Sequence, residues 1–161
     1  MGRHVTGFLR MRWLEPALVA ILAVLVAVVL GNVIGRYVFS FALTWADEMA
    51  RFLFVWLTFL GATVGVARGA HIGMDIVVQA LPPRAARVLQ ALALALMIVF
   101  LAVWGWYSVE LVQRSMTFRT PAMGMPRGYI YAIAPVSAVL MLLVCLHQFV
   151  RVVRGQEPQD A

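Results

Sequence analysis

Ionisable side chains gather at the two ends of one uncharged run, residues 52–67. They are Asp47, Glu48 and Arg51 before the run, and Arg68, His71 and Asp75 after it. Carboxylates beside an arginine could bind a cation or move a proton, and His71 lies one helical turn before Asp75. A metal site needs further ligands, however, and a catalytic pair needs a nucleophile or a pocket nearby. The sequence offers neither, so it predicts no enzyme, no catalytic residue, no metal site and no cofactor.

The first of these groups marks the start of a helix. Thr44 precedes Asp47 by three residues, a spacing that predicts a hydroxyl cap on a free backbone N–H and a carboxylate that reaches back. Asp47 and Glu48 fall in the first turn, where the positive end of the helix dipole favours acidic side chains. Arg51 follows within reach of both carboxylates, and Trp45 stands beside them. These residues predict a capped, amphipathic start to a membrane helix.

The composition indicates an integral membrane protein. The chain is 63% hydrophobic and 12% charged, whereas soluble domains have about 25% charged residues. About 20 apolar residues cross the hydrocarbon core at a rise of 1.5 Å each. Four stretches qualify, approximately 16–35, 45–68, 88–109 and 128–150. We therefore expect an all-α fold in which residues 1–161 form a single domain, a bundle of four transmembrane helices.

The predicted spans lack the side chains of a transport pathway. Pathways usually place an ionisable residue at mid-membrane depth, and none of the four spans has one. The polar side chains in or near the spans are neutral: Asn32, Thr58, Thr63, Gln90 and Ser137. Each of them can be satisfied by its own helix or by a neighbour. We expect no transport pathway within this chain alone.

Arginine counts predict the orientation. All 13 positively charged side chains are arginines. Eight lie on the side of the two termini (Arg3, Arg10, Arg12, Arg68, Arg84, Arg87, Arg151 and Arg154), against five on the other side. Both termini are therefore predicted to be cytoplasmic. The net charge of +6 does not indicate nucleic-acid binding, because the arginines sit at span ends rather than on one basic face. Membrane lipids with anionic headgroups are the expected partner.

Glycines recur every four residues along the second span and its exit. They are Gly61, Gly65, Gly69 and Gly73, and the first span repeats the spacing with Gly31 and Gly35. Such ridges let two helix backbones approach closely. The pattern fits either packing within the bundle or a docking face for another membrane protein.

The block from Thr44 to Asp75 also carries a resemblance to a known family. Its matching residues are Trp45, Asp47, Glu48, Arg51, Trp56, Gly61, Arg68, His71, Ile72 and Asp75. Together they resemble the small membrane subunit of tripartite ATP-independent periplasmic (TRAP) transporters, the DctQ-like family. The resemblance extends to the four spans, the turn at residues 81–83, and the prolines and tyrosine that open the fourth span.

The resemblance implies a system of three parts, of which two lie in the bacterial inner membrane and one is soluble in the periplasm. A periplasmic binding protein would deliver an organic acid, and a large permease subunit would hold the substrate and sodium sites. The small subunit would act as a scaffold without a substrate site of its own. The residues expected to meet these partners are Trp45, Asp47, Glu48, Arg51, Trp56, Gly61, Gly65, Arg68, His71 and Asp75. Dicarboxylates, sugar acids, sialic acid and other carboxylates all stay open as substrates.

Two other classes of membrane protein compete with this interpretation. A haem-bearing anchor of a respiratory enzyme would use histidines from different helices, and His71 and His147 fall on the same predicted side. His71, however, lies beyond its span in a glycine-rich exit. A small efflux transporter of four helices would carry a carboxylate within the first span, and residues 16–35 have none.

Overall fold

The fold is built from helices, as predicted. The computed structural model describes residues 13–41, 43–68 and 81–154. Its long helices are α2 (Leu14–Val38), α3 (Ala46–Ala67), α5 (Pro83–Ser115) and α7 (Ile133–Val153), and the short helix α6 (Gly128–Tyr131) precedes α7. Four helical stretches are long and apolar enough to cross a membrane, with α6 and α7 counted as one. The all-α membrane fold is therefore confirmed.

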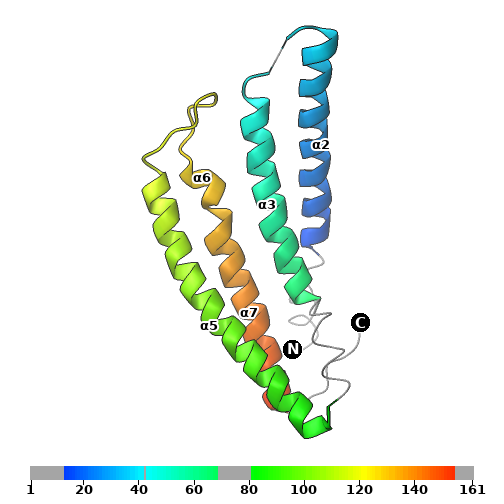
Figure 1. Ribbon diagram of the computed structural model, residues 1–161, viewed down its shortest axis with the longest axis vertical. Coiled ribbons are helices and arrows are strands. Elements are labelled where there is room, and N and C mark those ends of the chain that lie inside the picture. The colour runs from blue at the N-terminus through cyan, green and yellow to red at the C-terminus, as the bar shows by residue number, and fades with distance from the viewer. Residues whose placement is uncertain (1–12, 42, 69–80, 155–161) are drawn as a thin grey trace.

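The long helices lie side by side in a row rather than around a common centre (Figure 1). Their order across the row is α2, α3, α7 and α5, because α2 packs on α3, α3 on α7, and α7 on α5. Within α2, only Leu14 is buried. The outer helices thus expose apolar side chains along most of their length, as suits surroundings of hydrocarbon or of another membrane protein.

Two small apolar clusters hold the row together. One lies where α2, α3 and α7 meet and centres on Leu14, Leu60 and Val144. The other joins α5 to α7 through Leu101 and Cys145, with Val66 of α3 packed against it. Each cluster is local, so α3 and α7 form the middle of the layer and carry most of its packing.

The helix boundaries follow from local chemistry. Pro83 begins α5 at the first helical position, where its missing N–H costs nothing. Pro135 lies in the first turn of α7 and has no N–H to offer the carbonyl of Tyr131, four residues earlier. That missing hydrogen bond explains why α6 ends at Tyr131 and α7 starts anew at Ile133.

Two connections lie at the same end of the row, which we call the loop end (Figure 1). One is the turn from α2 to α3, and the other is the loop 116–127 between α5 and α6. The loop is ordered by its own backbone: the Thr120 N–H donates to the Met125 carbonyl at 2.8 Å, and the Arg127 N–H donates to the Phe118 carbonyl at 2.8 Å. Gly124, at φ 66°, takes the left-handed conformation that closes its turn.

Candidate functional site

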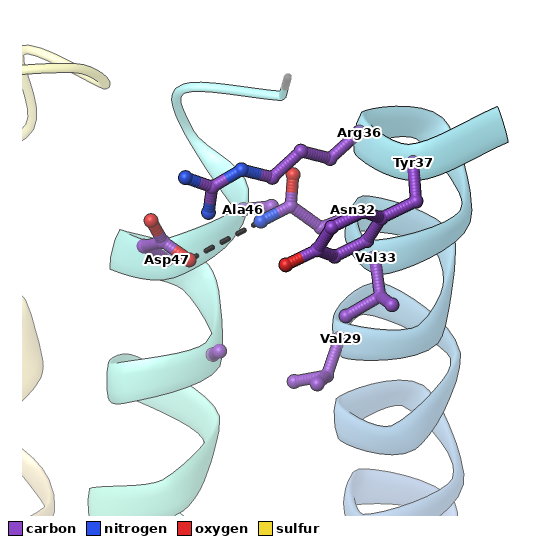
Figure 2. Close-up of a pocket in the computed structure, with 8 residues that line it drawn as sticks. Val29, Asn32, Val33, Arg36, Tyr37, Ala46 and Asp47 are labelled. Carbon is purple, nitrogen blue, oxygen red and sulfur yellow. Dashed lines mark hydrogen bonds between the residues drawn. The ribbon is translucent and has the colours of Figure 1, made fainter. Parts of the chain in front are cut away.

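The polar residues at the start of α3 are tied to other parts of the chain rather than to one another. The predicted cap by Thr44 is wrong, because Trp45 occupies the cap position of α3 and no side chain bonds there. Instead, the Asn32 Nδ2 of α2 donates to the Asp47 Oδ1 at 3.2 Å (Figure 2). The Asn32 Oδ1 accepts from the Leu43 N–H at 3.1 Å. Asn32 thus clamps the turn between α2 and α3.

Glu48 fastens α3 to the loop 116–127. Its Oε1 accepts from the Ala122 N–H at 2.8 Å, and its Oε2 accepts from the Met123 N–H at 2.9 Å. The partners are 74 and 75 residues away along the chain. Because backbone N–H groups have no sequence signature, the sequence singled out Glu48 without revealing what it binds.

One face of α3 stays open to its surroundings. Asp47 and Gly65 are 18 residues apart, which is five turns at 3.6 residues per turn, so they lie on the same face. We call this the glycine face; it consists of Asp47, Arg51, Phe54, Thr58, Gly61, Ala62 and Gly65. Phe54 is 61% exposed, and Arg51 is also exposed and forms no salt bridge with any described residue. The Thr58 hydroxyl donates to the Phe54 carbonyl at 2.8 Å, which leaves its methyl group free for packing.

The glycines of this face pack against nothing in the described chain. A Cβ added at Gly61 or Gly65 would meet no heavy atom within 4 Å. Close packing occurs elsewhere: a Cβ at Gly105 would lie 3.2 Å from the Ala138 Cβ, and one at Gly128 would lie 2.6 Å from the Met116 Sδ. Among the described residues, Gly61 and Gly65 therefore have no close-packed neighbour. Of the glycines in the predicted pattern, Gly35 does have one, since its added Cβ would lie 2.9 Å from the Phe41 carbonyl oxygen, whereas the spacing did not reveal Gly105 or Gly128.

The other residues expected at a partner interface are spread over the molecule. Trp56 lies nine residues from Asp47, or two and a half turns, so it projects from the opposite side of α3. Trp45 shares that side with Trp56, from which it is about three turns away. Arg68 lies at the far end of α3. His71 and Asp75 fall outside the described residues.

Arg68 has a partner that the sequence did not suggest. Its Nη2 donates to the Glu15 Oε1 at 2.7 Å, which joins the end of α3 to the first turn of α2. The side chains are 60% and 38% exposed. Such an exposed pair contributes little to stability, about 0–1 kcal/mol. It joins the two helices of the α2–α3 hairpin at the end opposite their turn. Glu15 could not be recognised as its partner because 53 residues separate the two.

The polar side chains of the described residues differ between the interior and the helix ends. The buried polar side chains are all neutral: Thr63, Ser108, Ser115, Thr120 and Ser137. Over the described ranges, no three His, Cys, Asp or Glu side chains come together as a metal site would require. The charged groups instead sit at the ends of the helices, where they link elements or face outward.

Helices that cross the membrane several times, with charges confined to their ends, define a multi-pass integral membrane protein. Residues 8–155 match the family described as tripartite ATP-independent periplasmic transporters, DctQ component. The chain belongs to this family. Proteins of this family are transporter subunits and not enzymes.

Relatives of this chain are permease proteins, some of similar length to this chain and some much longer. The chain is 27% identical over 153 residues to a Haemophilus influenzae protein named as a TRAP transporter small permease protein, covering 93% of this chain and 92% of that protein. It is 30% identical over 132 residues to the ectoine TRAP transporter small permease protein TeaB of Halomonas elongata, covering 79% and 67%. It is 27% identical over 158 residues to the isethionate TRAP transporter permease protein DctMQ of Oleidesulfovibrio alaskensis, covering 93% of this chain but 25% of that protein.

Proposed function

We propose that residues 1–161 form one membrane domain that serves as the small permease subunit of a TRAP transporter in a bacterial inner membrane. Its role is to scaffold a large subunit, which carries out sodium-driven uptake of an organic acid delivered by a periplasmic binding protein. Both termini lie in the cytoplasm in this proposal, so the loop end faces the periplasm. The distribution of arginines supports that orientation.

The observation that carries the proposal is the open glycine face of α3. In a bilayer, helices associate through close packing at small residues rather than through the hydrophobic effect. Gly61 and Gly65 offer such a site, and no described helix of this chain uses it. The longer DctMQ relative supports the large subunit as its occupant, because the stretch that matches this chain is a quarter of that single polypeptide.

The charged residues extend this surface at the loop end. Arg51 presents an exposed guanidinium on the glycine face, suited to a carboxylate or to backbone carbonyls of the large subunit. The loop held by Glu48 projects beyond the ends of α5 and α6 (Figure 1), and we assign it to contact with the binding protein. Trp45 and Trp56, on the opposite side of α3, are assigned to the lipid-facing side. Arg68 is assigned to ordering the hairpin through Glu15.

The experiment is affinity purification of the tagged full-length chain from its native membranes in mild detergent, with co-purifying proteins identified by mass spectrometry. The wild-type chain should bring down a larger multi-pass permease. The double variant Gly61→Leu with Gly65→Leu fills the open face and should lose that partner. Gly31→Leu is the matched control, because Gly31 on α2 is equally free of neighbours but lies outside the glycine face.

Three results would contradict parts of this proposal. Recovery of the wild-type chain alone, or with respiratory subunits and haem, would refute the subunit function. Retention of the large subunit by the double variant would refute the glycine face as its docking site. A changed substrate preference in Arg51→Ala, in place of a lower uptake, would refute the role of this chain as a scaffold.

A further inference from the structure

A small pocket opens between α2 and α3 at the loop end (Figure 2). Its volume is about 200 Å³, and both helices contribute to its walls. The pocket shares only Asp47 with the glycine face, whose Gly61 and Gly65 lie several turns further along α3, and it includes no residue of the loop held by Glu48. Its lining combines a cation, a carboxylate, a phenol and two valines.

The polar groups at the mouth have capacity left for a ligand. Arg36 is exposed and makes no salt bridge with any residue that the structure describes. Asp47 accepts from Asn32 through Oδ1, which leaves Oδ2 available. Figure 2 shows Arg36 and Tyr37 reaching from α2 toward α3, with Asp47 on the facing wall. Tyr37 is 79% exposed, so its hydroxyl is accessible.

The apolar part of the pocket lies deeper along the same helix. Val29 and Val33 precede Arg36 by seven and three residues, and all three line the pocket. A rise of 1.5 Å per residue puts Val29 about 10 Å further into the membrane than Arg36. A ligand that fits this order has an ionic head at the membrane surface and an apolar tail pointing inward.

We propose that this pocket binds a phospholipid of the ethanolamine type. Arg36 holds the lipid phosphate, since a guanidinium is suited to two parallel hydrogen bonds with phosphate oxygens. Asp47 accepts from the primary ammonium group, and the Tyr37 hydroxyl donates to a phosphate oxygen. The first methylenes of the acyl chains lie along Val29 and Val33. A purely anionic lipid would leave Asp47 facing negative charge, whereas a headgroup with both charges satisfies both walls.

Asn32 acts as a positioning residue in this site. Both polar atoms of its amide are engaged, because Nδ2 donates to Asp47 and Oδ1 accepts from the Leu43 N–H. Asn32 therefore fixes the position of the Asp47 carboxylate on α3 relative to α2, the helix that carries Arg36. In the described structure these two charged groups do not close on each other as a salt bridge, so the mouth stays open.

The test is native mass spectrometry of the delipidated full-length chain with equal amounts of phosphatidylethanolamine, phosphatidylcholine and phosphatidylglycerol of the same acyl chains. The wild-type chain should retain phosphatidylethanolamine about tenfold over phosphatidylcholine, which corresponds to one charge-assisted hydrogen bond. Asp47→Asn should remove that preference and leave phosphatidylglycerol binding in place. Arg36→Gln should lower retention of all three lipids, and Tyr37→Phe should lower it less.

The control variant is Arg114→Gln, which removes a cation near the same end of the molecule but outside the pocket. It should leave lipid retention unchanged. Equal retention of the three lipids, or unchanged retention in Arg36→Gln, would overturn the proposal. Displacement of the lipid by millimolar inorganic phosphate would also overturn it, because the site would then bind an anion only. The measurement uses the isolated chain, so its outcome is separate from the question of the large subunit.

Discussion

Glu48 gives the sharpest test of how the loop end is held together. Its two carboxylate oxygens accept from the backbone N–H groups of Ala122 and Met123, and each oxygen serves one of them. Glu48→Ala removes both acceptors. Glu48→Gln keeps one oxygen and turns the other into an NH2 group, which cannot accept from a backbone N–H. The two variants should therefore leave different numbers of loop amides without an acceptor and open to hydrogen exchange.

The expected numbers follow from the hydrogen bonds of the loop. Five other backbone N–H groups in this segment donate to acceptors within residues 115–125: those of Phe118, Thr120, Gly124, Met125 and Arg127. None of these five donates to Glu48, although the Thr120 hydroxyl that accepts from Met125 also interacts with the Glu48 carboxylate. Glu48→Ala should thus add two rapidly exchanging amides to the loop, and Glu48→Gln should add one.

Hydrogen–deuterium exchange of the purified chain, followed on a peptide that covers residues 117–127, measures these numbers directly. Asp47→Asn is the matched control, because Asp47 is the neighbouring carboxylate and bonds to Asn32 rather than to the loop. It should leave the peptide unchanged. Exchange in Glu48→Ala equal to that of the wild-type chain would refute the tether. Increased deuterium uptake at all amides of the peptide in Glu48→Ala would refute the reasoning that the loop holds its own shape.

Two further substitutions test the packing of the row. Gly128→Ala should lower the free energy of unfolding by about 1–3 kcal/mol, because its Cβ would lie 2.9 Å from the Val112 carbonyl oxygen. Thermal unfolding in detergent measures this loss, and the control variant Gly31→Ala should show none. A Gly128→Ala chain as stable as the wild-type chain would contradict the close approach. Ser137→Ala should raise stability by up to about 1 kcal/mol, because the buried Ser137 hydroxyl has no hydrogen-bond partner among the described residues. A loss of stability in Ser137→Ala, measured in the same unfolding assay, would reveal a partner for that hydroxyl.

The helices could be predicted from sequence because a membrane imposes the same two requirements on every span. Each span must satisfy its backbone internally and show apolar side chains, which long uncharged runs such as 52–67 reveal without knowledge of the fold. Their arrangement in one row could not be predicted, since apolar side chains look alike whether they face a neighbouring helix or lipid. Gly61 and Gly65 illustrate this limit, because their spacing fits close packing but does not say with what.

The polar residues at the loop end were recognised, but their partners were not. Asp47 and Glu48 stood out because carboxylates favour the first turn of a helix. The sequence then suggested contacts within that turn, from Thr44 and with Arg51, whereas the chain supplies Asn32 and the amides of a distant loop. Contacts between neighbouring residues have a characteristic spacing, but contacts made by the tertiary fold have none.

The single row of helices has a consequence for how this sequence is constrained. A layer one helix thick has two broad faces and almost no interior, so few of its side chains are fixed by the chain's own packing (Figure 1). At most positions, the residue type is constrained by the molecule that contacts it, which is lipid on some surfaces and protein on others. The substitutions that each position of α2 and α5 tolerates should therefore show whether lipid or another protein lies against that position.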